Sequence, residues 1–441
     1  MKLSKLLRGL ILGLPAALFL SYHPAIALGS GDSMNFELSV AVIYLVLFDI
    51  AAFFLLVQEK RFARLFDRWQ FLILPIFVTA SVFWSGNFVR GALTAGMMWM
   101  VYFAIMAMVV LRDKIFIGDF SRRFLKWFFG ASLVACAWCV SQCVMDMLGV
   151  PRECTLLCKG CVSQTFGFPH PNGFAIEPQF MGNLLLAPAL VSGALLIKKK
   201  KPYLFLLFFV FSSTLFLTFS RGAIYAFALA LIFMTIYYIV KKNGMWVWVL
   251  WPMALVAFLV TLNAQGLMSE FGPTSETYMG GISKVINHLS LGVIDLKVEK
   301  PVILDDKDEA VFDGYVEEST NVRVGLTNSA LKVWRKDFVT AMFGVGLGGA
   351  GEAMYAAGEI DSPKEIVQNE YASLLLEIGL VGVAIVVLTV VMVLKIVLKL
   401  ENSGMILALI LAYAVTLLFF SGLPNALHVY LLPVIFGTIK K

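Results

Sequence analysis

The residues with the clearest chemical potential are charged side chains that interrupt apolar stretches. Arg221 stands within Thr218-Phe-Ser-Arg-Gly222, inside a hydrophobic run over 202–240 that is long enough for two membrane-spanning helices of about 20 residues. Basic clusters at 198–201 and 241–242 place both ends of this run in the cytoplasm and the turn at the outer face. An arginine there is a candidate functional residue. The alternative is a lipid anchor whose charged head reaches water.

A second polar group surrounds the start of the preceding predicted helix. Glu177 falls a few residues into a predicted span, and His170 and Asn172 stand at its outer mouth. A carboxylate at that depth usually faces a polar cavity or a cation. Arg221 is the expected partner, because both residues lie near the outer face. The pair could equally be structural and hold two helices together, since buried ion pairs are weak evidence for function.

Composition assigns the chain to one class of protein. It has 441 residues, of which 60% are hydrophobic and only 15% are charged. Such a composition indicates an all-α protein that crosses the membrane many times. The net charge of +6 is divided among short clusters between the predicted spans, so it predicts membrane topology and no nucleic-acid partner.

Hydrophobic segments and basic loops predict about 12 membrane-spanning helices. The expected spans are 10–20, 37–57, 70–84, 91–111, 127–148, 173–197, two within 202–240, 245–262, 374–394, 404–420 and 423–437. Every dense basic loop then falls on the same side of the membrane, which supports both the count and the orientation.

Four segments follow from this topology. Residues 1–28 are a signal-like segment or a first span, because cations precede an apolar stretch and a small-residue site follows it. Residues 29–262 form a helix bundle, and 371–441 form the C-terminal spans. Between them, 263–370 is a polar loop that we expect outside the cytoplasmic membrane.

The second half of this loop shows helical order. Apolar side chains recur at helical spacing over 320–340, at Val324, Leu331, Trp334 and Phe338. The sequence Ser362-Pro-Lys-Glu365 has the form of a capping box, with proline at the first helical position. It predicts a helix that runs through Gln368 into the next span.

Two motifs have the spacing of cofactor sites, yet neither predicts a cofactor. Gly344-x-Gly346-x-x-Gly349 matches the dinucleotide fingerprint, but no strand precedes it. Its backbone amides could still approach an anionic ligand. The thiols of Cys154, Cys158 and Cys161 have the spacing of an iron–sulfur site. Outside the cytoplasm we expect disulfides instead, among these three or with Cys143. Cys136 and Cys139 are expected to be packing residues.

Four short groups of residues between about 165 and 385 follow one another in an order that is informative. They are Gly167–Asn172, Thr218–Gly222, Arg323 with Trp334 and the glycines of 344–348, and Gln368-Asn-Glu-Tyr371 followed by 376–382. The ordered set resembles the O-antigen ligase and O-antigen polymerase superfamily.

The resemblance implies a GT-C-like glycosyltransferase in the bacterial cytoplasmic (inner) membrane. Its donor would be a glycan on an undecaprenyl-pyrophosphate carrier at the outer face of the lipid bilayer. Its acceptor would be a hydroxyl on a glycan, a lipid-linked core or a protein. No nucleotide sugar, cofactor or metal is implied.

The resemblance also implies roles for individual residues. Arg221 and Arg323 would bind the pyrophosphate and stabilise the charge that develops on it. The substrate site would also include Ser220, His170, Asn172, Glu177 and Asn369. Ligases of this family usually place a histidine, the proposed base, where this chain has Gln368. Glutamine cannot take a proton, so Gln368 would orient a hydroxyl, and Glu370, Glu177 or His170 could be the base.

Two other classes of function stay open. A transporter or flippase of lipid-linked saccharide would suit the many spans. Transporters, however, tend to show repeated halves and helices broken near the midplane, whereas this sequence has no internal repeat. A non-catalytic relative that recruits a partner is compatible with Gln368. We favour the transferase, either a polymerase or a ligase.

Overall fold

The computed structural model describes residues 2–20, 25–30, 35–148, 170–175, 177–241, 245–272, 277–294, 296, 321–400 and 402–419. Within these ranges the fold is helical, as the sequence predicts, with one exception. Strands β1 (Ala25–Ser30) and β2 (Asn35–Ser39) form an antiparallel hairpin between the first two helices.

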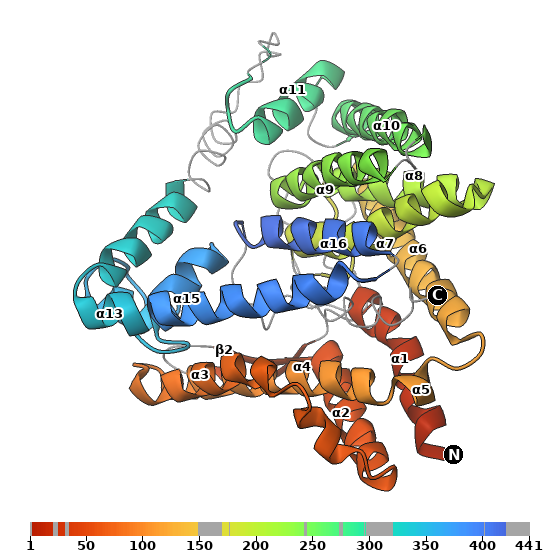
Figure 1. Ribbon diagram of the computed structural model, residues 1–441. Coiled ribbons are helices and arrows are strands. Elements are labelled where there is room, and N and C mark those ends of the chain that lie inside the picture. Colours follow the sequence, from red (N-terminus) through yellow and green to blue (C-terminus); the bar gives the residue numbers. More distant parts are fainter. Residues whose placement is uncertain are drawn as a thin grey trace.

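The helices follow one another along the chain (Figure 1). They are α1 (Lys2–Leu20), α2 (Val40–Gln58), α3 (Ile73–Ser81), α4 (Phe88–Val110), α5 (Arg112–Ile115), α6 (Phe120–Met147), α7 (Pro178–Lys199), α8 (Pro202–Leu217), α9 (Arg221–Val240), α10 (Leu250–Phe271), α11 (Tyr278–Leu289), a helix over 321–334, α13 (Phe338–Phe343), α14 (Ala350–Ala356), α15 (Glu370–Val397) and α16 (Ser403–Thr416). Short 3-10 turns flank α3 (Trp69–Leu72 and Val82–Trp84) and precede α10 (Met245–Val249).

Seven helices in the described part of the chain are long and apolar enough to cross a membrane: α2, α4, α6, α7, α9, α10 with its preceding turn, and α15. Three shorter apolar helical segments, Trp69–Trp84, Pro202–Leu217 and Ser403–Thr416, fall where the sequence predicts spans. A multi-pass membrane protein is therefore confirmed. The predicted span over 423–437 lies outside the described residues, and the count of 12 stays a prediction.

The core of the bundle is built around α7. In its most apolar window 89% of the residues are buried, against 11% in α15. Helices α8, α9 and α16 pack around α7, as Figure 1 shows in yellow, green and blue. Because α7 begins at Pro178, which needs no hydrogen-bond partner for its nitrogen, Glu177 precedes the helix. The expectation that Glu177 lies inside a span is therefore wrong.

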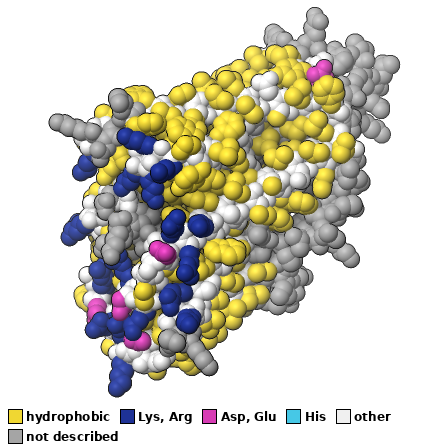
Figure 2. Space-filling view, turned by 90° about the vertical axis from the view of Figure 1, so that its right-hand side faces the viewer, with side chains coloured by type: hydrophobic (Ala, Val, Ile, Leu, Met, Phe, Trp, Pro, Cys, Tyr) yellow, Lys and Arg dark blue, Asp and Glu magenta, His cyan; other side chains and the backbone are white. Residues whose placement is uncertain are grey.

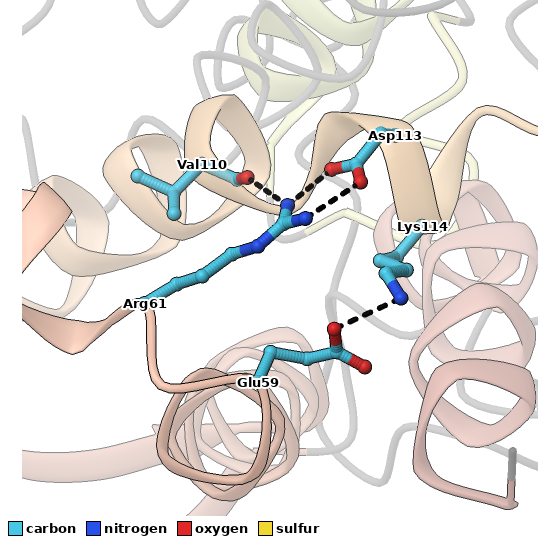
Figure 3. A network of polar contacts seen from close by, with 5 residues as sticks. All are labelled: Glu59, Arg61, Val110, Asp113 and Lys114. Atoms are coloured by element: carbon cyan, nitrogen blue, oxygen red, sulfur yellow. Dashed lines mark hydrogen bonds and ion pairs between the residues drawn. The ribbon is translucent and has the colours of Figure 1, made fainter.

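Cationic side chains gather at one end of the molecule. Figure 2 shows Lys and Arg side chains at one end of the visible face and hydrophobic side chains over most of the rest. Near the ends of α2 and α4, Arg61 donates to both carboxylate oxygens of Asp113, at 2.5 and 3.0 Å, and Lys114 contacts Glu59 at 2.9 Å (Figure 3). Two basic loops that the sequence predicts on the same side of the membrane are thus in contact.

Helix α10 continues beyond the predicted end of its span. It runs to Phe271, so the polar loop begins later than the predicted boundary at 263. The extra turns are ordered because α11 packs on them, burying Leu262 and Met268 against Val285. Gly281 of α11 permits this approach, since a Cβ there would lie 2.1 Å from the hydroxyl oxygen of Ser269.

The helix predicted over 320–340 is shorter in the structure, and the side chains that it buries differ from those predicted. It ends at residue 334, and α13 starts after Asp337, whose carboxylate accepts from the Thr340 amide at 2.8 Å. Its buried stripe is Leu326, Ala330 and Val333, whereas Val324 and Phe338 are exposed. Ala330 and Val333 belong to the core formed with α14 and α15, and Trp334 of the predicted face packs against that core. Tertiary packing therefore buries a face that agrees only in part with the one that hydrophobicity alone indicated.

The predicted capping box over 362–365 does not start a helix. The Glu365 amide donates to the Ser362 carbonyl at 3.1 Å, which closes a turn around Pro363. Helix α15 begins only at Glu370. Asn369 caps it, accepting from the amides of Tyr371 and Ala372 at 3.1 and 3.2 Å. The prediction of a helix through Gln368 is therefore wrong.

The glycine-rich loop after α13 connects neighbouring helices through hydrogen bonds from its backbone amides. Its Val345 and Gly346 amides donate to α15 carbonyls at 2.9 Å, and its Leu347 amide donates to Ser81 Oγ at 3.2 Å. Gly346 has φ +89°, and a Cβ there would lie 2.6 Å from the backbone of Ser85. These amides are engaged within the protein, which contradicts the expectation that they could bind an anionic ligand. The loop joins α15 to the α3–α4 hairpin.

Candidate active site

Arg221 is the first residue of α9 and lies at a strained turn. Phe219 adopts φ +45°, which is unusual for a residue with a side chain, and this reverses the chain between α8 and α9. Ser220 then caps α9, its Oγ accepting from the Ala223 amide at 3.4 Å. The Arg221 side chain is only 8% exposed. Its charge adds to the positive end of the α9 dipole, so this turn favours an anion.

Small residues bring this turn close to the core helix. Gly182 on α7 faces it, and a Cβ at Gly182 would lie 2.9 Å from Thr218 Oγ1 and 3.0 Å from the Cβ of Ser220. The position of Arg221 is thus set by contact between the turn and the most buried helix of the bundle.

His288 at the end of α11 closes over the same turn. Its Nε2 lies 3.2 Å from the carbonyl oxygen of Phe219, and the hydroxyl of Tyr225 donates to the Leu289 carbonyl. Burial lowers the pKa of His288 to about 3, and electrostatic interactions with Arg221, His170 and Arg323 act in the same direction. Sequence reasoning missed His288, because it belongs to none of the motifs.

Arg323 reaches the site from the helix over 321–334. Its Nε donates to Oε1 of Gln368 at 2.8 Å. Gln368 therefore orients an arginine, a role that the sequence reading did not assign to it. Because the carbonyl oxygen of Gln368 faces Arg323, its amide NH2 group is left to donate to a neighbouring oxygen.

Glu177 is coupled to Arg323, whereas the sequence reading paired it with Arg221. Neighbouring protein atoms raise the pKa of Glu177, although its side chain is exposed, and the positive charge of Arg323 opposes this effect. An exposed carboxylate beside an arginine can accept a hydrogen bond from a hydroxyl, so Glu177 keeps its place among the candidate bases.

The mouth segment over 170–175 is held by α6. Gln142 Nε2 donates to Asn172 Oδ1 at 2.9 Å, and Gln142 Oε1 accepts from the Gly173 amide at 2.8 Å. The side-chain Nδ2 of Asn172 donates to the Ala175 carbonyl oxygen at 2.8 Å. Asn172 thus holds the loop in place, and His170, 6% exposed, is brought near His288. Gln142 was missed, although a lone glutamine in an apolar helix is a signal for such a contact.

Glu370 and Asn369 lie at the start of α15. Asn369 is the cap of the helix, and Glu370 is only 5% exposed, with its amide donating to the Leu417 carbonyl at 2.9 Å. The charge of Glu370 acts on Tyr371 and Glu377 of its own helix. Asn369 is therefore part of the start of α15, and the backbone of Glu370 links α15 to the end of α16.

The structure therefore brings together residues from five separate segments. Arg221, Arg323 and His170 act electrostatically on His288, and Gln368 and Glu177 are linked to Arg323. Such a site can hold a compact anion beside a hydrogen-bonding acceptor group. In the described residues, no three His, Cys, Asp or Glu side chains form a group that could hold a metal ion. Cys154, Cys158 and Cys161 lie outside those residues, so their pairing stays a prediction.

Part of the chain matches a known family. A family model described as O-antigen ligase matches residues 205–387, a stretch that contains Arg221, Arg323 and Gln368. A search of curated proteins found no match. His170 and Glu177 precede the matched stretch. The match over residues 205–387 supports a relationship to the O-antigen ligase and polymerase superfamily.

Proposed function

We propose that this protein transfers a glycan from an undecaprenyl-pyrophosphate carrier to a hydroxyl acceptor at the outer face of the bacterial cytoplasmic membrane. The observation that supports this most is that the charges of Arg221 and Arg323, which come from segments far apart in the chain, both act on the pKa of His288. The family match supports the same reading.

The two arginines suit a pyrophosphate leaving group. Guanidinium groups bind phosphate oxygens in pairs of hydrogen bonds and keep their charge at any relevant pH. Arg221 is fixed by the α8–α9 turn, and Arg323 is fixed by Gln368. Charge that develops on the departing pyrophosphate would meet donors already in position, so little reorganisation would be required during the reaction.

The acceptor hydroxyl needs a group that can take its proton, which the amide of Gln368 cannot do. We propose Glu177 for this role, because it is exposed and coupled to Arg323. General-base assistance is typically worth about 10²–10⁴ in rate. Because pyrophosphate leaves as a stable anion, we expect that replacing Glu177 lowers the transfer rate by a factor at the low end of that range.

The carrier chain needs an apolar surface beside the site. Helix α15 exposes large apolar side chains along its length, including Leu380, Val387 and Leu388. Since it begins directly after Gln368 and Asn369, we propose that the polyprenyl chain lies along α15 while the pyrophosphate reaches the arginines.

The test uses purified protein in proteoliposomes that contain a polyprenyl-pyrophosphate-linked glycan and a candidate acceptor. Donor and products are followed by mass spectrometry for wild type, Arg323→Ala and the control Arg335→Ala. Arg335 is an exposed arginine that lies over Trp334 just beyond the same helix, with the ring centroid 5.8 Å away. We expect donor consumption by wild type and Arg335→Ala but not by Arg323→Ala.

Two results would contradict the proposal. One is donor that crosses the bilayer without a new glycosidic bond, which would favour a flippase. The other is Arg323→Ala that consumes donor at the wild-type rate. A lengthened glycan among the products would indicate a polymerase, and glycan on a different acceptor would indicate a ligase.

A further inference from the structure

Helix α13 exposes large apolar side chains, although it lies in the loop that the sequence marks as polar. None of its six residues is buried, and the side chains of Phe338 and Val339 are 76% and 65% exposed. An exposed cation, Lys336, comes shortly before them. Apolar side chains next to a cation are typical of a segment at a membrane surface, where the apolar groups enter the lipid and the cation stays among the headgroups.

The position of α13 relative to a bilayer can be measured along α4. At one end of α4, the Val110 carbonyl accepts from Arg61 between the two cationic loops (Figure 3). Near the other end, the glycine-rich loop that follows α13 packs on Gly91, where a Cβ would lie 2.4 Å from the Leu347 carbonyl oxygen. A rise of about 1.5 Å per residue separates Gly91 from Val110 by about 28 Å, close to the roughly 30 Å thickness of the hydrocarbon core.

Helix α15 gives a second measure that does not depend on α4. Its backbone breaks at Gly379, where φ is +63°, and a Cβ there would lie 2.4 Å from the carbonyl oxygen of Met342 in α13. The next charged residue of α15 is Lys395, about 24 Å further along the helix, from where its long side chain can reach water. Both helices therefore place α13 at the membrane surface opposite the cationic loops. In Figure 1, α13 lies at the left and α5, which follows α4, at the right.

The exposed face of α13 adjoins surfaces of the bundle that face lipid. Directly after the break at Gly379, α15 exposes Leu380, and further along it exposes Val387. The glycine-rich loop also ties α13 to the tip of the α3–α4 hairpin, where Phe83 is exposed. Exposed aromatic side chains at one level of a helix bundle are characteristic of the boundary between membrane and water.

We propose that α13 is inserted in the bilayer at the surface opposite the cationic loops, with Phe338 and Val339 among the lipid acyl chains and Lys336 beside lipid phosphates. The partner of this exposed face is thus the membrane itself. The inference goes beyond the proposed function and does not depend on it, because contact with lipid requires no glycan donor.

Such an anchor would also set the height of Arg323. The indole Nε1 of Trp334 donates to the Ala341 carbonyl at 3.0 Å, which joins the helix over 321–334 to α13. Arg323 lies about 16 Å from Trp334 along that helix. If α13 left the membrane, it would carry this helix with it, so the lipid contact keeps Arg323 close to the membrane surface.

The test uses the wild-type chain in nanodiscs that contain a phospholipid with an aryl diazirine on its acyl chain. After illumination the protein is digested, and lipid adducts are located by mass spectrometry. We expect adducts on Phe338 or Val339 and on the lipid-facing Val387. We expect none on Asn328, an exposed polar residue of the helix over 321–334.

Two variants test whether the apolar side chains cause the insertion. Phe338→Asp removes an apolar ring from the lipid and adds a charge, so adducts on α13 should fall roughly tenfold while those on Val387 stay. Asn328→Asp is the matched control, because it adds the same charge at another exposed position of the loop. It should leave the adducts on α13 unchanged. Neither change removes a buried side chain.

Three results would overturn the inference. One is labelling of Val387 without labelling of α13, which would place α13 in water. Another is equal labelling of α13 in Phe338→Asp and in wild type. The third is an unlabelled α13 together with a dimer in native mass spectrometry, which would mean that a second copy covers this face. The transferase proposal would be untouched by all three, since none of them involves the donor.

Discussion

Gly182 sets how close the Arg221 turn can approach the core, and replacing it with alanine tests whether that distance matters. The added Cβ would lie 2.9 Å from both Thr218 Oγ1 and the Cβ of Ala223 and 3.0 Å from the Cβ of Ser220. Carbon atoms in proteins pack at about 3.5–4.0 Å, so the turn must move outward by roughly 0.5–1 Å. Thr218 and Ser220 are part of the turn itself, and no flexible side chain can absorb the shift.

We expect two effects of different size from Gly182→Ala. Overpacking of a well-packed core costs about 1–3 kcal/mol, which should lower the unfolding temperature of the protein in detergent. A displacement of about 1 Å at a catalytic group can cost about 100-fold in rate, so glycan transfer should fall further than stability does. Protein folded at the assay temperature should therefore be deficient in transfer.

Gly130→Ala is the matched control, because Gly130 also lies in an apolar helix but a Cβ added there would have nothing within 4 Å. It should leave transfer unchanged and raise stability slightly, since alanine has the better helix propensity. If Gly182→Ala transfers glycan as fast as Gly130→Ala, the close approach of the turn to α7 is not what positions Arg221.

Three further changes test the surroundings of the site. Gln368→Glu should pair its carboxylate with Arg323 and remove that arginine from the donor, reducing transfer at least tenfold with little change in unfolding temperature. Gln142→Leu leaves Asn172 and the Gly173 amide without their partner, and should destabilise the protein by about 1–3 kcal/mol in thermal unfolding. Asp113→Asn should destabilise slightly near pH 7, because the hydrogen bond from Arg61 lowers the pKa of Asp113. That contribution is present above the unfolded pKa and lost as pH falls through the folded value, so wild type and variant should converge in acid.

The membrane architecture could be predicted because its signals are local. A run of apolar residues must form a helix in a bilayer, and basic loops report the side on which it ends. Ten of the predicted spans thus coincide with apolar helical segments of the structure. The predicted helix ends were wrong where packing between helices determines them. One example is Phe271, where α11 orders the end of α10.

The site was only partly predictable, because its contacts join distant segments. Arg221 and Arg323 were selected through a resemblance, and their coupling to His288 depends on how α11 folds back onto the α8–α9 turn. The glycine-rich loop was misread for the same reason. The partner of its Leu347 amide is Ser81, 266 residues away, which no local pattern indicates.

The most direct test of the central idea is a double-mutant cycle on the two arginines. Arg221→Gln, Arg323→Gln and the double variant are compared for consumption of polyprenyl-pyrophosphate-linked glycan in proteoliposomes. If both arginines bind one pyrophosphate, each single variant should lose most of the activity, and the double variant should lose little more. Strictly additive losses, or wild-type consumption by either single variant, would contradict a shared pyrophosphate site.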